Sequence, residues 1–185
     1  MAEAKRRHSV IMVGLGGQGV LLAGDLLARA AMSQYEHVLW FPLYTVFMRG
    51  APSECTVILS DQSIPCQIIS QADTLLAMES SQLKPFESRV KPGGNIIVEK
   101  TGLTAEVERD DVRMWTIPAL ETTLAIGGDT QASNLVMLGA YLAIAKVIPP
   151  ETVQREIEIK FSGKGKSLSL NIEAFKQGLA IVTNQ

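Results

Sequence analysis

A short segment near the start of the chain, residues 14–19, reads Gly-Leu-Gly-Gly-Gln-Gly. It lies between a brief apolar run at residues 9–13 and a segment rich in leucine and alanine at residues 20–31. A G-x-G-x-x-G pattern in this setting predicts a strand, a tight glycine turn and a helix. The glycines allow backbone N–H groups at the start of the helix to approach a phosphate. This unit constrains the fold more than any other part of the sequence.

The rest of the chain alternates short apolar runs with helical patterns. We expect further strands at residues 37–41, 55–60, 74–78, 95–99 and 112–117, a turn at 91–94 and a linker at 162–166. We expect helices at residues 80–90, interrupted near Pro85, and at 118–126, 133–147, 151–161 and 171–183. Near-continuous apolar strands that alternate with helices are typical of a mainly parallel sheet covered on both faces. The sequence therefore predicts a single Rossmann-like α/β domain, residues 1–185, with helices on both faces of the sheet.

The end of the second expected strand indicates whether the glycine turn binds a dinucleotide. Enzymes that bind NAD through this turn carry an acidic residue about 20 residues further on, at the end of the second strand. Here that position reads Trp40-Phe41-Pro42, and Glu36 precedes the strand instead of ending it. A nicotinamide or flavin ligand is therefore disfavoured, and another phosphate-bearing ligand is favoured. The alternative is a turn that binds nothing, because glycines also permit close packing of a helix on a sheet.

A second informative segment, residues 42–50, carries four large apolar or aromatic side chains and one cation. Exposed apolar loops usually contact a partner. We therefore expect Tyr44, Phe47 and Met48 to pack against another chain, and Arg49 to contact a phosphate or a carboxylate. The alternative is that these side chains cover the end of the sheet.

A third segment, residues 127–134, is another glycine-bearing entry into a helix. It allows an anion contact, but we favour a helix cap in which Ser133 or Asn134 accepts backbone hydrogen bonds. Lys164 and Lys166 lie in the glycine-rich linker and are expected to be solvated.

Composition excludes several classes of partner. The formal net charge of −2 and the sequence pI of about 5.7 give no basic field that would attract nucleic acid or anionic lipid. No apolar run approaches the roughly 18 residues that a membrane-spanning helix needs. We therefore expect a cytoplasmic protein that binds neither nucleic acid nor membrane.

The chain carries no recognisable set of catalytic or metal-binding residues. It has no serine, histidine and aspartate set, no paired carboxylates and no cluster of metal ligands. Cys55 and Cys66 do not form a C-x-x-C pair, so an iron–sulfur or zinc site is not expected, and both are interpreted as small buried hydrophobic residues. The sequence predicts no catalytic residue and no metal ligand in this chain.

The informative segments together resemble the gamma subunit family of 2-oxoacid:ferredoxin oxidoreductases. The resemblance rests on residues 14–20, on residues 42–50 with 55–57, and on residues 134–140, and it covers most of the chain. It departs from the family in the second segment, where the family usually reads Pro-Ser-Tyr-Gly before Met-Arg-Gly-Gly. This chain has Leu43, Thr45 and Ala51 in place of a serine and two glycines.

The resemblance implies an oxidative decarboxylation in which a 2-oxoacid and coenzyme A give acyl-CoA, CO2 and reduced ferredoxin. Alpha and beta subunits, with delta as a further candidate, would hold thiamine diphosphate, magnesium and iron–sulfur clusters, and ferredoxin would act through the complex. This chain would hold no cofactor alone and would not be active alone. The sequence does not choose among pyruvate, 2-oxoglutarate, branched-chain oxoacids and indolepyruvate.

The resemblance also implies where this chain touches coenzyme A and its partners. The implied coenzyme A contacts are Gly14, Gly16, Gly17, Gln18 and Gly19, with Arg49 near the subunit interface. An interface without its partner makes a homodimer of the isolated chain an expectation. The alternative interpretation is a stand-alone nucleotide-binding regulatory module with a Rossmann-like fold. A free-standing nucleotide-dependent enzyme is disfavoured, because the second strand lacks its acid and no substrate domain follows.

Overall fold

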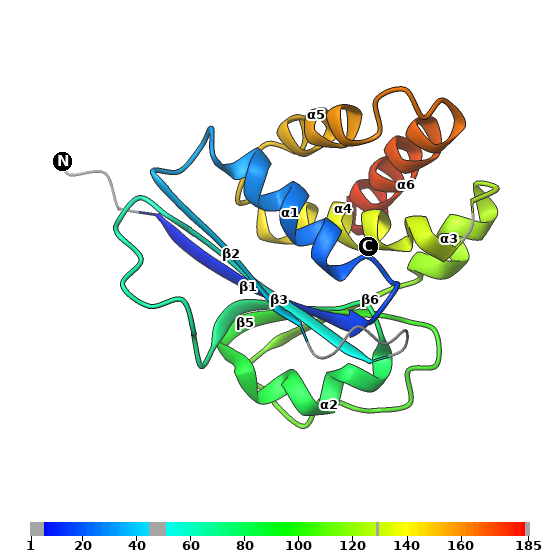
Figure 1. Cartoon of the computed structure of the whole chain (residues 1–185). Coiled ribbons are helices and arrows are strands. Elements are labelled where there is room, and N and C mark those ends of the chain that lie inside the picture. Colours follow the sequence, from blue (N-terminus) through cyan, green and yellow to red (C-terminus); the bar gives the residue numbers. More distant parts are fainter. Residues whose placement is uncertain (1–5, 45–50, 129, 184–185) are drawn as a thin grey trace.

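The computed structural model describes residues 6–44, 51–128 and 130–183, which form one sheet and the helices packed on it (Figure 1). The strands are β1 (Arg7–Leu15), β2 (His37–Tyr44), β3 (Pro52–Ser60), β4 (Ala72–Ala77), β5 (Val90–Glu99) and β6 (Arg113–Ile117). The α-helices are α1 (Val20–Ala31), α2 (Leu83–Phe86), α3 (Ala119–Ala125), α4 (Ser133–Ala145), α5 (Pro150–Lys160) and α6 (Lys166–Thr183). Short 3-10 helices are η1 (Ser80–Gln82), η2 (Glu87–Arg89) and η3 (Thr130–Ala132). Each expected strand and the first expected helix are confirmed.

The sheet is mainly parallel, as predicted. Its strand order is β2-β3-β1-β4-β5-β6, and β1, β4, β5 and β6 pair in parallel. The strand β3 is antiparallel to both β1 and β2, so it alone among the described strands runs against the others. Parallel neighbours need a crossover of a dozen or more residues. The stretch between β2 and β3 is shorter than that, and an antiparallel pair follows.

Helices cover the two faces of the sheet unequally. Figure 1 shows α1, α3, α4, α5 and α6 on one face and α2 on the other. The larger core lies under the first group, where Met12, Val57 and Leu76 meet Leu135 and Phe175. The smaller core, which includes Ile11, Leu75 and Ile96, is covered by Leu83 and by apolar residues between 103 and 112. The expected helix at 80–90 is broken into η1, α2 and η2, so the second face receives little helical cover.

The helix α4 is the centre of the larger core. Its residues from Asn134 to Leu142 are all buried, so it has no polar face. Glycines allow α4 and α6 to approach closely: a Cβ added at Gly139 would collide with the Phe175 carbonyl, and one at Gly178 with the Val136 carbonyl. None of the helices in the described residues is both long and apolar enough to cross a membrane.

Two expected boundaries are wrong. The expected turn at 91–94 is an irregular part of β5, in which the register against β4 shifts between Ala72 and Thr74. Position 94 favours glycine, because the Cβ of any other residue would lie 2.7 Å from the Asp73 carbonyl oxygen. The last helix begins at Lys166 instead of residue 171. It follows directly on Gly165, which has a φ of 40°.

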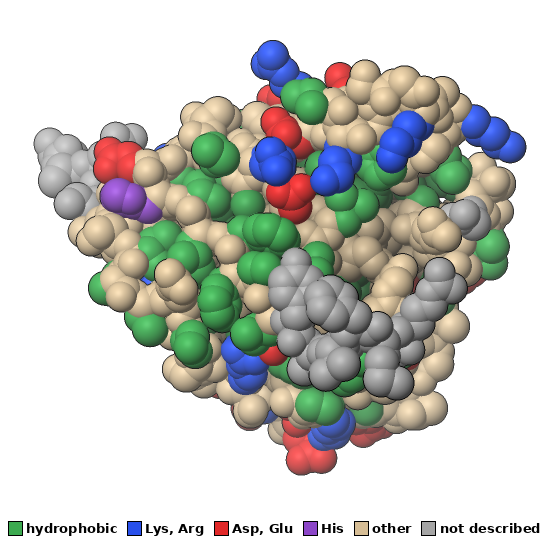
Figure 2. All heavy atoms as spheres, in the orientation of Figure 1, with side chains coloured by type: hydrophobic (Ala, Val, Ile, Leu, Met, Phe, Trp, Pro, Cys, Tyr) green, Lys and Arg blue, Asp and Glu red, His purple; other side chains and the backbone are tan. Residues whose placement is uncertain are grey.

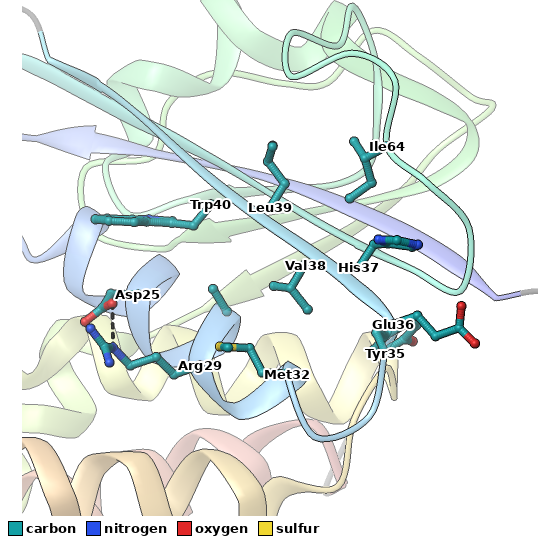
Figure 3. A pocket seen from close by; sticks show the side chains of 11 residues that line it. Asp25, Arg29, Met32, Tyr35, Glu36, His37, Val38, Leu39, Trp40 and Ile64 are labelled. Atoms are coloured by element: carbon teal, nitrogen blue, oxygen red, sulfur yellow. Dashed lines mark hydrogen bonds and ion pairs between the residues drawn. The ribbon is translucent and has the colours of Figure 1, made fainter.

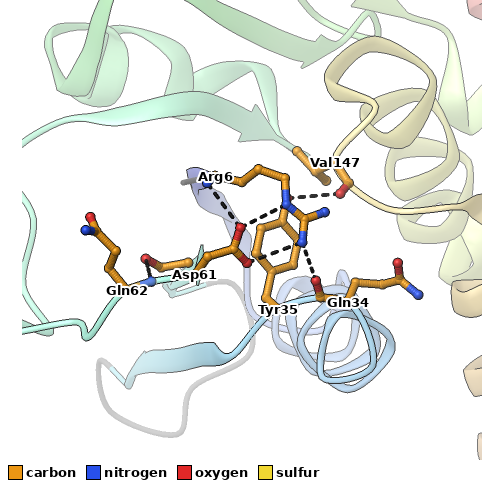
Figure 4. Close-up of polar contacts among 7 residues, drawn as sticks. Arg6, Gln34, Tyr35, Asp61, Gln62 and Val147 are labelled. Carbon is orange, nitrogen blue, oxygen red and sulfur yellow. Dashed lines mark hydrogen bonds and ion pairs between the residues drawn. The ribbon is translucent and has the colours of Figure 1, made fainter. Parts of the chain in front are cut away.

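A polar cluster fastens the amino end of β1 to three other segments (Figure 4). The Arg6 guanidinium forms an ion pair of 3.0 Å with Asp61, donates to the Gln34 carbonyl at 2.6 Å and lies 4.5 Å from the centre of the Tyr35 ring. The Tyr35 hydroxyl donates to the Val147 carbonyl at 3.0 Å. The hydrogen bond from Arg6 holds the pKa of Asp61 below its usual value. This cluster lies at the end of the sheet opposite to the glycine turn.

Candidate functional site

The glycine turn lies at the carboxyl end of β1, inside the sheet and not at its edge. After β1 the chain crosses to β2 at one edge, whereas β4 lies on the other side of β1. Open α/β sheets bind ligands at the carboxyl ends of their strands where the chain changes direction in this way. The backbone N–H of Met78 donates to the Val13 carbonyl at 2.8 Å, so the end of β4 lies directly beside the turn.

The turn itself depends on two glycines in the left-handed region. Gly17 has φ of 101° and Gly19 has φ of 77°. The Gln18 N–H donates to the Leu15 carbonyl at 3.1 Å, which closes the turn. The Gly16 N–H donates to the Ala51 carbonyl at 2.8 Å, so the turn also contacts the residue just before β3.

The Gln18 side chain points back into the protein and braces the turn. Its Oε1 accepts from the Leu15 N–H at 2.7 Å, and its Nε2 donates to Glu79 Oε2 at 2.8 Å. A Cβ on Gly14 would lie 2.7 Å from Gln18 Oε1, so Gly14 leaves the space that this amide occupies. Sequence reasoning missed Glu79, which carries no motif of its own and follows β4.

Asn134 holds the other end of the turn. Its Nδ2 donates to the Gly19 carbonyl at 3.2 Å, and that carbonyl also accepts the first α1 hydrogen bond, from the Ala23 N–H at 3.0 Å. A Cβ on Gly19 would collide with the Asn134 amide. The expected cap is therefore wrong for both candidates, because Asn134 reaches Gly19 and the Ser133 hydroxyl donates to the Thr130 carbonyl at 2.8 Å.

The predicted loop residues are brought together, but they are not equally accessible. Gly14 is buried within β1, Gly17 is exposed, and Gly16, Gln18 and Gly19 are partly exposed. Among the described residues no side chain caps α1, so its first backbone N–H groups are available to an anion. The accessible face of this site is therefore backbone, which suits a phosphate. Arg49, the sixth predicted contact, lies outside the described residues, as do Phe47 and Met48.

A second carboxylate near this end of the sheet, that of Glu99, accepts hydrogen bonds within the protein at both of its oxygens. Glu99, at the end of β5, is 3% exposed, and its Oε2 accepts from the Ala119 and Leu120 N–H groups at 2.8 and 3.2 Å. Its Oε1 accepts from the backbone N–H and the hydroxyl of Thr101 at 3.0 and 2.7 Å. Glu99 thus caps α3 and is not placed to act as an acid or base.

Strand β2, one of the two edge strands of the described sheet, carries exposed apolar side chains. Figure 2 shows hydrophobic side chains gathered over α1 and β2 on the face in view. Leu43 is 40% and Trp40 36% exposed in β2, and Met32, just after α1, is 70% exposed. An edge strand also presents unpaired backbone groups, so this surface favours association with another chain.

A groove of about 630 Å³ runs between α1 and this edge strand (Figure 3). Met32 and Arg29 line it from the helical side, and Val38 and Trp40 from the strand. Asp25 is paired with Arg29 at 2.7 Å, and also with Lys160 at 3.3 Å. The groove is lined by apolar side chains from Val38 to Trp40, by Glu36 and His37 at the start of the strand, and by paired charges at the helix. This mixed lining suits a protein surface better than a phosphate.

The two cysteines differ. Cys55 is buried as expected, and burial raises its pKa to about 12, so its thiol is protonated and unreactive. Cys66 is exposed, which corrects the expectation for it; its thiol donates to the Ile68 carbonyl at 3.0 Å. Across the described parts of the chain, no three His, Cys, Asp or Glu side chains are grouped to hold a metal ion.

Known proteins resemble this chain over nearly its whole length. Residues 9–181 match the family described as pyruvate ferredoxin/flavodoxin oxidoreductase. The chain is 34% identical over 170 residues to the ketoisovalerate oxidoreductase subunit VorA of Methanothermobacter thermautotrophicus, covering 91% of this chain and 35% of that protein. It is 30% identical over 183 residues to the 2-oxoglutarate synthase subunit KorC of Methanothermobacter marburgensis, covering 95% of this chain and 97% of that protein. The chain thus spans about a third of the length of VorA and nearly all of KorC.

Solved structures share the fold. The gamma subunit of the keto/oxoacid ferredoxin oxidoreductase of Geobacter sulfurreducens superposes with a TM-score of 0.82 at 26% identity, covering 95% of both chains. The 2-oxoglutarate:ferredoxin oxidoreductase of Magnetococcus marinus, solved with 2-oxoglutarate, coenzyme A and succinyl-CoA bound, superposes with a TM-score of 0.86 at 24% identity. That superposition covers 97% of this chain and 32% of the Magnetococcus chain.

Proposed function

Because the chain belongs to the pyruvate ferredoxin/flavodoxin oxidoreductase family, we propose that it is the gamma component of a multi-subunit 2-oxoacid:ferredoxin oxidoreductase. The observation that carries this proposal is the match along nearly the full length of KorC, a protein named as a subunit of such an enzyme. The expected resemblance to the gamma subunit family is confirmed, and the stand-alone regulatory module is not favoured.

The complex would convert a 2-oxoacid and coenzyme A to acyl-CoA and CO2, and an electron pair would pass to ferredoxin. Thiamine diphosphate, magnesium and iron–sulfur clusters would belong to the partner alpha and beta subunits, with delta as a further candidate. The described residues of this chain do not fit a cluster, since no three His, Cys, Asp or Glu side chains among them are grouped to hold a metal ion, and the Cys55 thiol is buried. Its contribution would be binding and assembly.

The glycine turn is the proposed contact for coenzyme A. The N–H groups at the uncapped start of α1 and the exposed Gly17 would receive a phosphate of the coenzyme, and Gln18 and Asn134 would hold the turn rigid behind it. Arg49 would add a cation near the subunit interface. Bound coenzyme A in the Magnetococcus enzyme, which shares this fold, supports the choice of ligand.

The apolar edge strand β2 is the proposed interface to a partner subunit. Exposed Leu43 and Trp40 and the unpaired edge of β2 lie on the strand that leads into residues 45–50, where the resemblance implies the interface. Association would bury this surface, and an isolated chain would bury it by forming a homodimer.

The first test is purification of the tagged chain from its native cells without oxygen, followed by mass spectrometry and an assay for coenzyme A-dependent oxidation of 2-oxoacids. We expect larger thiamine diphosphate and iron–sulfur subunits to co-purify and acyl-CoA to form. A chain that returns alone and inactive would contradict the proposal.

A matched pair of variants tests the coenzyme A contact. Gly17 and Gly93 both have positive φ, and a Cβ at either would meet no atom within 4 Å, so G17A and G93A introduce similar backbone strain. Only Gly17 lies in the turn. We expect G17A to raise the KM for coenzyme A in the complex about tenfold, as for a loss of roughly 1.4 kcal/mol of binding, while G93A leaves it unchanged. Equal KM values for the two variants would remove the turn from the coenzyme A site.

A further inference from the structure

A cavity of about 680 Å³ lies where α4 ends and α5 begins. We call it the α4–α5 pocket. It adjoins the polar cluster of Figure 4, from which Arg6, Gln34 and Val147 line it. That cluster lies at the end of the sheet opposite to the glycine turn, so the pocket is separate from the proposed coenzyme A contact. Its volume lies within the range of roughly 300–1,000 Å³ that is usual for small-molecule sites.

The walls of the α4–α5 pocket are aliphatic. Its buried part is formed by Leu142 and Ile148, which are 2% and 5% exposed. The more accessible apolar side chains that line it are those of Ala143, Val147, Pro149, Pro150 and Leu179. None of the described lining residues is aromatic, and none carries a carboxylate. Walls of this kind suit an alkyl chain, because each methylene that leaves water is stabilised.

Two cations line the pocket, and they differ in their partners. Arg6 Nε lies 3.0 Å from Asp61 Oδ2, so this charge is balanced within the protein. The Lys146 side chain is exposed and forms no ion pair or hydrogen bond with any residue that the structure describes. One unbalanced positive charge beside aliphatic walls suits a ligand that carries a single negative charge.

The backbone of Lys146 indicates that a side chain is needed at this position. Lys146 follows the last residue of α4 with φ of 50°, and within the described ranges it is the one residue other than glycine with a positive φ. Glycine is usual at such a position, because a Cβ is unfavourable in the left-handed region. A lysine in the last turn of α4 would stabilise the helix end equally well without this conformation. Helix stability alone therefore does not account for Lys146.

From these observations we infer that the α4–α5 pocket binds a short aliphatic carboxylate. The alkyl chain lies against Leu142 and Ile148, and the carboxylate pairs with Lys146. The inference is independent of the proposed function, because the lining residues belong neither to the glycine turn nor to strand β2.

The test is an NMR titration of the full chain with acetate, butanoate, hexanoate and 1-hexanol. We expect hexanoate to shift the methyl signals of Leu142, Val147, Ile148 and Leu179. The affinity should rise about three- to fourfold for each methylene added between butanoate and hexanoate. The uncharged 1-hexanol has the same chain length and should bind about fivefold more weakly than hexanoate.

A matched pair of variants tests the role of the cation. K146N removes the charge and keeps the backbone, because asparagine adopts the left-handed region more readily than most residues. We expect K146N to lower the affinity for hexanoate about fivefold and to leave that for 1-hexanol unchanged. K100N, which removes an exposed lysine just after β5, should change neither affinity. No shift at the four methyl-bearing residues, equal binding of acetate and hexanoate, or an unaltered hexanoate affinity in K146N would overturn the inference.

Discussion

Both polar groups of the Gln18 amide form hydrogen bonds within the protein. Oε1 accepts from the Leu15 backbone and Nε2 donates to Glu79, which fixes the orientation of the amide. A side chain held in this way positions the backbone around it. Its contribution to binding, if the turn receives a phosphate, is the rigidity of the turn.

Exchanging the amide of Gln18 and the carboxylate of Glu79 tests whether the two side chains interact. Q18E keeps an acceptor for Leu15 but places a carboxylate against Glu79, so we expect a loss of about 1–3 kcal/mol in the free energy of unfolding. E79Q alone should cost less, and Q18E/E79Q restores a donor opposite a carboxylate and should recover most of the loss. Urea denaturation of the four proteins measures this. Simple addition of the single-variant losses in the double variant would show that the two side chains do not interact.

A second residue-scale prediction concerns His8, at the start of β1. Burial lowers its pKa; nearby Asp73 opposes this effect and Lys91 adds to it. The folded protein therefore binds a proton at His8 less readily than the unfolded chain does. Stability from this residue is complete above the unfolded pKa of about 6.5 and falls as the pH drops below it, by at most about 1.4 kcal/mol per pH unit.

Replacing the His8 imidazole tests how much of the loss of stability at low pH comes from this residue. H8Q should flatten the decline of the free energy of unfolding between pH 6.5 and 5, whereas H37Q, which alters an exposed histidine on the edge strand, should leave the decline as it is. Denaturation curves at half-unit pH steps provide the measurement. An unchanged decline in H8Q would assign the acid sensitivity to other groups.

At the scale of elements, the closest packing joins α4 and α6. The Val136 carbonyl occupies the place of a side chain at Gly178, and the Phe175 carbonyl does so at Gly139. An alanine favours a helix over glycine by roughly 1 kcal/mol, but here it would force two backbones apart.

We therefore expect G178A to lower the free energy of unfolding by about 1–3 kcal/mol in spite of its better helix propensity. S169A, at an exposed position of the same helix, is the matched control and should be neutral or slightly stabilising. Thermal and urea denaturation check both. A stabilised G178A would mean that the helices can separate at no cost.

Elements were predictable from the sequence to the extent that their signals are local. Apolar runs placed all six strands, and the glycine turn placed α1 to the residue. The bulged start of β5 was missed because Pro92 and Gly93 are typical of a turn, whereas in the structure they lie in the register break between the pairs Val90–Ala72 and Asn95–Thr74. Glu79, and the contact of Asn134 with the turn, were missed for a related reason: the partners in the turn lie 61 and 115 residues away, and only the finished fold brings them together.

At the scale of the whole molecule, the described sheet ends in two edge strands, β2 and β6. The strand β2 is an edge, with Leu43 and Trp40 exposed on it and a groove behind it. The isolated chain is expected to pair through this edge, and in the proposed complex a partner subunit takes the same place.

A charge at the edge should prevent both associations. L43K places a lysine on the exposed strand, which disfavours strand pairing, and should convert a dimer of the isolated chain to a monomer and reduce recovery of partner subunits. L124K changes a residue that is 59% exposed on α3 and serves as the control. Light scattering and co-purification are the measurements. A wild-type chain that is strictly monomeric, or an L43K variant that keeps its partners, would place the interface elsewhere.

The division of the molecule into a sheet made early and helices made late has a consequence during its synthesis. The four strands β2, β3, β1 and β4 are complete once residue 77 has been translated, whereas α4, α5 and α6 lie between residues 133 and 183. Until those helices leave the ribosome, α1 and α3 are the only described α-helices available to cover an apolar face that includes Val10, Met12 and Leu76 (Figure 1). A nascent chain that stalls in this interval exposes the surface that chaperones recognise, so synthesis of the last third decides whether the protein is recovered folded or aggregated.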